Sequence, residues 1–371
     1  MYHSCYLSPM PTWRLIRPLV YALGGTVALV LSAMAITSGA RLPASEFGSF
    51  YLTGQAAWSG GNWYPNGNLN PPAAGVLFAP LAWFTPSTAF LLWTLANVIA
   101  SAWAVWRIAR VLQVPWPLLA IATALLTGSL ATLRMGQLSG LLFALVSAAW
   151  LADRRGSTRN AGLLLGVAMA FKPFLGVFVV GWLMLTRWTA VIAALIAIAA
   201  VSMIGLVFGT ERYIEWVQLL RSINWYDQPM NASIRGLVAI HGWPLWVNEI
   251  FVAAVALATL IAVRRAPIDA AWLMLLSSSI LLSPLGWVYY TPLLVGPAVA
   301  VGVNSPRARP LLIVGALCLM SPYPPILPWI FGWGTLLIFA AALLRPTDPA
   351  GMSPARQSHP RGPALVQEQG S

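Results

Sequence analysis

The sequence predicts an all-α polytopic membrane protein, and its composition and its long apolar runs both support this fold class. Of the 371 residues, 59% are hydrophobic and only 8% are charged. An ordinary soluble domain carries about 25% charged residues, so water does not solvate most of this chain. The apolar residues are spread almost evenly over 1–344, which predicts one membrane domain. Residues 345–371 are rich in Pro, Ser and Gln without apolar periodicity, which predicts a disordered cytoplasmic tail.

The apolar runs predict how often the chain crosses the membrane. A membrane-spanning helix needs about 20 consecutive apolar residues. Clear candidates are 17–37, 86–107, 188–209, 245–263 and 325–344. Shorter or broken candidates are 115–133, 137–152, 160–172, 173–186, 268–283, 286–303 and 309–321. Together they predict about 10–12 transmembrane helices on this length rule.

The arginines predict the orientation of these helices. The formal net charge is +12, but most arginines lie in short clusters between apolar runs, which is the pattern of the positive-inside rule. A nucleic-acid-binding face would gather them on one surface instead, so no nucleic-acid partner is expected. The arginines that fall outside under this scheme are Arg41, Arg134, Arg212, Arg221 and Arg235. We therefore expect both termini in the cytoplasm and a functional site that faces outward.

Two long loops lie on the outer side, at about 38–71 and 210–244. Residues 47–58 of the first loop mix aromatic and small polar side chains, as an interfacial helix does. The apolar piece 72–84 that follows is too short to cross comfortably and is expected to dip into the outer leaflet. The cysteines and histidines are too scattered along the chain to predict a disulfide, a metal site or a cofactor.

Glu46 is the only acid in the first outer loop. A carboxylate at the membrane boundary is partly desolvated, which suits a general base that activates a hydroxyl group. The alternative is an ordinary solvated acid paired with Arg41.

Lys172 is the only lysine in the chain, and Pro173 follows it. Arginines of the inside type flank the run 160–186, so the chain is expected to enter from the inside, break at Lys172-Pro173 and return. A buried ammonium group beside a helix break needs a partner, and a phosphate is a natural one. The alternative is a lysine that extends to the outer interface.

Other polar residues converge on the same outer side. Arg134 could hold an anionic group or anchor the interface, and Gly136-Gln137 combines a flexible backbone with amide hydrogen-bonding groups. In the second loop, the aromatic residues Trp225 and Tyr226 lie near the acid Asp227. Three further polar residues follow them: Asn231, Ser233 and Arg235. Sugar-binding sites usually combine polar side chains, which bind the hydroxyl groups, with aromatic rings, on which the sugar ring stacks. The segment 283–290, with Trp287 and Tyr289, begins another span on this side, so the sequence predicts an outward active site.

These segments together resemble glycosyltransferase family 87, the bacterial polyprenol-phosphate-mannose-dependent α-mannosyltransferases of the GT-C membrane fold. Order and spacing agree over most of residues 17–300. The matching residues are Ser45-Glu46-Phe47, Tyr51, Gly60 or Gly61, Tyr64, Pro71-Pro72, Gly136-Gln137, Gly166 through Lys172-Pro173, Asn231, Ser233, Gly236, Ser283-Pro284 and Trp287. The chain departs from the family at Glu46, where the family usually has Asp, and at Tyr289, where it often has His.

The resemblance implies a function and a set of site residues. A sugar, expected to be mannose, would move from a polyprenyl-phosphate donor to a cell-envelope glycolipid or polysaccharide, on the outer face of a bacterial plasma membrane and among its lipids. Glu46 would be the base, and Lys172 with Arg134 would bind the donor phosphate. The sugar and substrate sites would be lined by Tyr51, Tyr64, Gln137, Asn231, Ser233, Arg235, Trp287 and Tyr289.

Two alternatives stay open at this point. A transporter or flippase would use the same basic residues along a substrate path, with polar residues that reach the inner side. A non-catalytic relative would bind the lipid phosphate without transfer, and the departures at Glu46 and Tyr289 leave room for it. The sequence does not set the oligomeric state.

Overall fold

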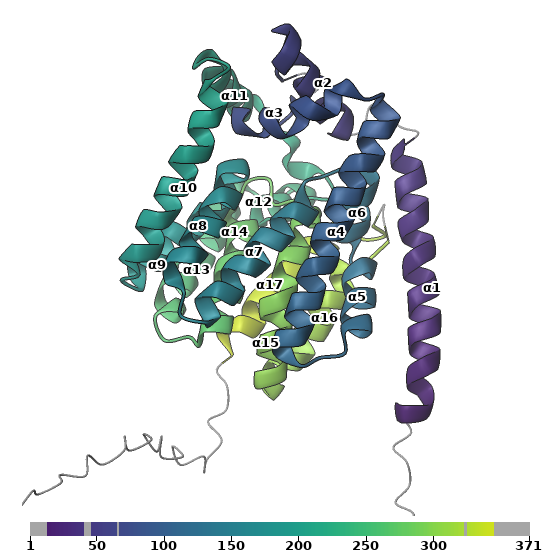
Figure 1. Ribbon diagram of the computed structural model, residues 1–371. Helices are drawn as coiled ribbons and strands as arrows, with labels where there is room; N and C mark the ends of the chain where they lie inside the picture. The colour runs from purple at the N-terminus through teal and green to yellow at the C-terminus, as the bar shows by residue number, and fades with distance from the viewer. Residues whose placement is uncertain (1–12, 41–45, 65–66, 323–324, 345–371) are drawn as a thin grey trace, which may run out of the picture.

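The computed structural model describes residues 13–40, 46–64, 67–322 and 325–344 (Figure 1). Within these ranges the regular structure is helical, with one isolated antiparallel bridge between Asn231 and Trp287. This confirms the predicted all-α fold. Arg41, Ser45 and the predicted tail 345–371 lie outside the described residues.

The helices follow one another closely along the chain. The α-helices are α1 (Trp13–Ala40), α2 (Glu46–Ser59), α3 (Pro72–Phe78), α4 (Pro86–Leu112), α5 (Trp116–Leu125), α6 (Thr127–Met135), α7 (Ser139–Arg154), α8 (Thr158–Phe171), α9 (Val177–Met184), α10 (Trp188–Leu206), α11 (Glu211–Ser222), α12 (Ile234–Ile240), α13 (Leu245–Val263), α14 (Ile268–Leu282), α15 (Val295–Asn304), α16 (Arg309–Leu319) and α17 (Ile330–Leu343). Short 3₁₀ segments are η2 (Ala79–Trp83), η3 (Pro173–Gly176), η4 (Trp225–Asp227), η5 (Val288–Leu294) and η6 (Pro306–Ala308).

Four helices in the described part of the chain are long and apolar enough to cross a membrane: α1 from Ile16 onward, α4, α10 and α13. The consecutive helices α5 and α6 add a fifth span if the bend of 66° between them is accepted. The other predicted runs form shorter helices, so fewer spans meet the length criterion than the sequence predicted. In the run 325–344, Pro325 and Pro328 lack the backbone N–H that a helix needs, and α17 begins only at Ile330.

The helices form a bundle that is capped at one end by α2, α3 and α11 (Figure 1). We call this end the capped end. Helix α14 lies at the centre, since every residue from Asp269 to Leu281 is buried. Helix α1 stands at the edge of the bundle, beside α5 and α6. Most of its side chains are exposed in the protein, as expected for a helix that faces lipid.

Helices α8 and α10 pack closely along their length. Gly162 of α8 lies against Ala190 of α10, and Gly166 lies against Ala194; a methyl group on either glycine would be 2.3 or 2.5 Å from the facing carbonyl oxygen. Small residues at a four-residue spacing allow such close approach in membrane helices. Because both contacts advance in the same direction, the two helices are parallel.

This parallel pairing fixes the path of the chain around Lys172. Helix α8 ends at Phe171, and η3 and α9 lead back to the start of α10. The break predicted at Lys172-Pro173 is therefore present, and the chain returns from it as predicted. Since α10 continues into α11 at the capped end (Figure 1), Lys172 lies toward the same end.

A buried charge network joins α7, α10 and α14 at the end of the bundle opposite to Lys172. Asp153 at the end of α7 pairs with Arg187 before α10 at 2.5 Å and accepts a hydrogen bond from Trp272 at 2.7 Å. Arg154 pairs with Asp269 of α14 at 3.2 Å. The two carboxylates are buried, so each needs its cationic partner. The network holds α7, α10 and α14 in register far from the capped end.

At the capped end, α2 packs directly on α3 and η2. The rings of Phe50 and Phe78 stack with their centroids 4.7 Å apart. Gly54 allows close approach of α3, because a methyl group on Gly54 would be only 2.4 Å from the Phe78 carbonyl oxygen. The helix predicted over 47–58 therefore exists, with one face buried against the short apolar piece 72–84.

Candidate active site

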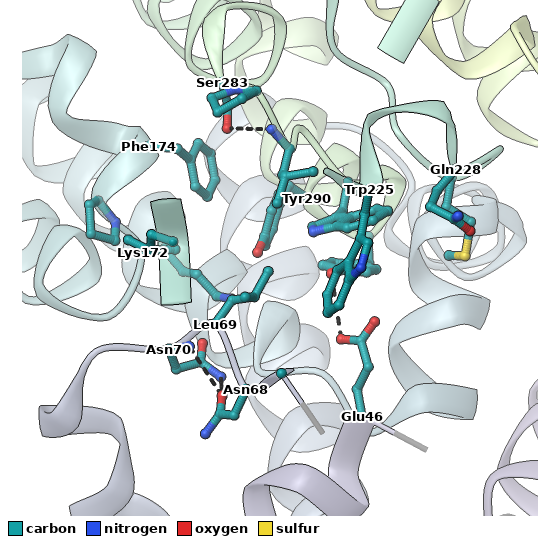
Figure 2. Close-up of a pocket in the computed structure, with 18 of the residues that line it drawn as sticks. Glu46, Asn68, Leu69, Asn70, Lys172, Phe174, Trp225, Gln228, Ser283 and Tyr290 are labelled. Carbon is teal, nitrogen blue, oxygen red and sulfur yellow. Dashed lines mark hydrogen bonds between the residues drawn. The ribbon is translucent and has the colours of Figure 1, made fainter. Parts of the chain in front are cut away.

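A cavity of about 780 Å³ lies against α2 and α11 at the capped end, and Figure 2 shows residues that line it. Its walls come from segments that are distant in the sequence: the start of α2, residues 67–70, residues 172–177, residues 225–230 and residues 279–290. Of the sequence-predicted site residues, the lining includes Glu46, Lys172, Trp287 and Tyr289. The fold thus brings the predicted base and the predicted phosphate ligand into one cavity.

Glu46 is placed by the residue that follows it. Phe47 is buried between Phe90, with ring centroids 5.4 Å apart, and Gly136. Gly136 has a positive φ of 66°, and a methyl group on it would be 2.6 Å from the Cβ of Phe47. Trp93 donates a hydrogen bond to the Gly136 carbonyl at 2.8 Å. Gly136, of the Gly136-Gln137 pair that the sequence singled out, therefore supports the start of α2.

The environment of Glu46 changes its acidity. Burial in the surrounding protein raises the pKa of the Glu46 carboxyl to about 7, against the opposing effects of the Lys172 charge and a hydrogen bond from Tyr289. That hydrogen bond is long, at 3.5 Å between the Tyr289 hydroxyl and Glu46 Oε2. A carboxyl group that titrates near neutral pH is suited to accept a proton and release it again.

Lys172 lies across the cavity from Glu46 (Figure 2). Its side chain is 8% exposed, and its Nζ atom lies 5.4 Å from the centroid of the Tyr290 ring. Among the described residues, no carboxylate lies within ion-pair distance of Lys172. A buried ammonium that faces a cavity and an aromatic ring is well placed to bind an anionic group of a substrate.

Aromatic side chains form one wall of the cavity. Trp287 and Tyr289 stack at 5.9 Å, and Tyr290 packs on Phe174 at 4.4 Å. Trp225 reaches over Gly67, where a methyl group would be 2.6 Å from its ring. This contact joins the two loops that the sequence predicts to lie outside, beside a cavity with the kind of aromatic surface on which sugar rings stack.

Asn231 and Ser233 do not line the cavity. The Asn231 side chain donates to the carbonyls of Tyr226 and Pro284 at 3.1 and 3.0 Å, and accepts from the backbone of Ser233 and Gly286 at 3.2 and 3.0 Å. Ser233 caps the start of α12. Both polar side chains therefore bind backbone groups and hold the second outer loop against the segment 284–287.

The remaining predicted residues do not line the cavity. The Tyr51 hydroxyl donates to the Phe84 carbonyl at 2.8 Å and the Tyr64 hydroxyl to the Arg212 carbonyl at 3.0 Å. Three other predicted residues are also outside the lining: Arg134 in the last turn of α6, the buried Gln137 that follows it, and Arg235, whose guanidinium lies 4.7 Å from the Tyr226 ring centroid.

The cavity also contains polar residues that the sequence reasoning did not select. Asn68, Asn70, Gln228 and Tyr290 all line it. Asn68 and Asn70 lie in a loop without apolar periodicity. The only sequence feature that could have pointed to them was the presence of two amide side chains shortly before Pro71-Pro72. In the described part of the chain, no three His, Cys, Asp or Glu side chains gather as metal ligands would.

Comparison with protein-family models matches residues 68–322 to glycosyltransferase family 87. The match covers more than half of the chain, so the chain belongs to this family and is a membrane glycosyltransferase. It includes Lys172 and the aromatic wall, whereas Glu46 precedes it. No curated protein and no solved structure matches the chain.

Proposed function

We propose that this glycosyltransferase moves a sugar, with mannose as the expected one, from a polyprenyl-phosphate donor to a hydroxyl group of a cell-envelope glycolipid or polysaccharide. The observation that carries the proposal is the pairing of Glu46 and Lys172 across one aromatic-walled cavity. A carboxylate can take the proton of the attacking hydroxyl and a buried cation can stabilise the leaving phosphate, so the two groups suit transfer from a lipid phosphate.

In the proposed reaction, Glu46 removes the proton of the acceptor hydroxyl as its oxygen attacks C1 of the sugar. The bond between C1 and the phosphate oxygen breaks, and the polyprenyl phosphate leaves with one additional negative charge. Lys172 stabilises this charge as it develops in the transition state. Attack from the side opposite the phosphate inverts the configuration at C1.

The location of the cavity supports a lipid-linked donor. It lies at the capped end, away from the Asp153–Arg187 pair, whose Asp153 directly precedes the inside-type cluster Arg154-Arg155. Under the positive-inside rule, the capped end faces outward. The apolar helices around it would deliver the phosphate of a membrane-dissolved donor at the level of Lys172.

The proposal is tested by sugar transfer from radiolabelled polyprenyl-phosphate mannose to total envelope lipids, in membranes that contain equal amounts of each protein. We expect transfer by the wild type and its loss in Glu46→Gln and Lys172→Met. Asp227→Asn is a matched control, because Asp227 is an outer-loop acid that does not line the cavity. Absence of transfer by the wild type would overturn the choice of donor, and loss in the Asp227 variant alone would assign the base to Asp227.

A further inference from the structure

The loop 67–70 contains a buried hydrogen-bond acceptor that no protein group satisfies. Asn70 is 2% exposed and lines the cavity. Its Oδ1 atom has no hydrogen-bond partner among the described residues. Buried side-chain oxygens are nearly always paired, because an unpaired one costs about 1–3 kcal/mol. An unpaired acceptor in the wall of a binding cavity is therefore a site for a ligand donor.

The neighbouring groups fix the orientation of the Asn70 amide. Asn68 Oδ1 accepts both the backbone N–H of Asn70, at 3.1 Å, and its side-chain Nδ2, at 2.8 Å. Asn68 Nδ2 in turn donates to the Thr53 hydroxyl at 2.8 Å, which donates to the Trp63 carbonyl at 2.8 Å. If the Asn70 amide were reversed, its oxygen would face the Asn68 oxygen. The chain of donors thus holds Asn70 Oδ1, and not Nδ2, free to accept.

An acceptor of this kind selects a particular ligand group. A phosphodiester oxygen carries no proton at neutral pH and would be repelled by Oδ1, whereas a hydroxyl group can donate to it. In the cavity, Asn70 lies on the same side as Lys172, and Glu46 lies opposite (Figure 2). A group that reaches Asn70 would therefore lie on the Lys172 side of the cavity.

We infer that Asn70 is a specificity-determining residue that accepts a hydrogen bond from one ring hydroxyl of the donor sugar. The assignment of this ring to the donor rests on the proposed function, while the demand for a hydroxyl donor rests on the Asn68–Asn70 geometry alone. A site built to bind a hydroxyl rejects the analogue that lacks it, because the buried acceptor is then left unpaired.

The test uses purified protein, a short-chain water-soluble polyprenyl-phosphate mannose and its 2-, 3-, 4- and 6-deoxy analogues. Binding is read from quenching of tryptophan fluorescence, since Trp225 and Trp287 line the cavity, and transfer is read separately. We expect one deoxy analogue to bind the wild type about ten- to a hundredfold more weakly than the parent donor. In Asn70→Ala and in the near-isosteric Asn70→Leu, the parent and this analogue should bind equally.

Asn248→Ala is the matched control. Asn248 in α13 is also a buried asparagine whose Oδ1 has no partner among the described residues, but it does not line the cavity. Its substitution should leave the preference for the parent donor unchanged. If the Asn70 variants do not fold, the wild-type series still decides, because equal binding of all four analogues and the parent overturns the inference.

The two proposals fail in different ways. Transfer by the wild type without any preference that depends on Asn70 overturns the role of Asn70 and leaves the proposed function standing. Binding that depends on one hydroxyl and on Asn70, without transfer, overturns the proposed function and supports the Asn70 site. No binding of any mannosyl probe overturns both.

Discussion

Gly136→Ala tests whether the start of α2 is held in a catalytic position by the α6–α7 connection. In the structure, a methyl group on Gly136 would be 2.6 Å from the Phe47 Cβ, and ordinary contact begins at 3.4 Å. Phe47 must therefore move by about 0.8 Å, and Glu46 precedes it directly in the chain. A displacement of about 1 Å at a catalytic group can lower the rate about a hundredfold.

The substitution also strains the backbone, because Gly136 has a φ of 66°. A residue with a Cβ in this conformation costs about 1–2 kcal/mol, so the variant should also be less stable. Gly156→Ala separates the two effects: Gly156 has a φ of 78°, but its added methyl group would meet no atom within 4 Å. It should lose a similar amount of stability and keep its transfer rate.

Both variants are compared with the wild type by thermal unfolding in detergent and by the initial rate of sugar transfer at saturating donor. We expect both to unfold at lower temperature and only Gly136→Ala to lose about a hundredfold in rate. Transfer by Gly136→Ala at the wild-type rate, or an equal loss of transfer rate in Gly156→Ala, would refute the argument that Phe47 positions Glu46.

Three further predictions concern pH and stability. Because the pKa of Glu46 is raised to about 7, transfer should fall about tenfold per pH unit below 7 as the base becomes protonated; a pH–rate profile flat from 5 to 8 would contradict this. Asp153→Asn removes the buried carboxylate that pairs with the partly exposed Arg187 and accepts a hydrogen bond from Trp272, so thermal or denaturant unfolding should show a loss of about 1.5–3 kcal/mol, and an unchanged stability would argue against the network. Asn231→Ala removes the hydrogen bonds between the second outer loop and the segment 284–287, so limited proteolysis should cleave this loop faster while the wild-type loop resists.

The sequence predicted the fold class and the break at Lys172-Pro173 because both depend on local chemistry. An apolar run must be helical in lipid, and a proline after the only lysine interrupts the run whatever lies around it. The number of spans could not be predicted as well. Pro325 and Pro328 shorten α17, and the bend between α5 and α6 follows from packing, where Gly128 lies against the Val288 carbonyl.

The site was predictable only in part, for a related reason. Glu46 and Lys172 stand out because their residue types are rare in this chain. Asn70 is an amide in an aperiodic loop, and its unpaired oxygen depends on contacts with Asn68 that no spacing rule encodes. Asn231 is a residue type that often binds sugars, but its amide is bonded to backbone groups, two of which lie 53 and 55 residues away along the chain.

The most direct test of the central claim compares donor binding and sugar transfer by the wild type and Glu46→Gln. The membranes must contain equal, verified amounts of each protein. The account predicts that the variant binds polyprenyl-phosphate mannose as the wild type does and transfers the sugar about 10²–10⁴-fold more slowly, which is the range expected for loss of a general base. Transfer by Glu46→Gln at the wild-type rate would contradict it.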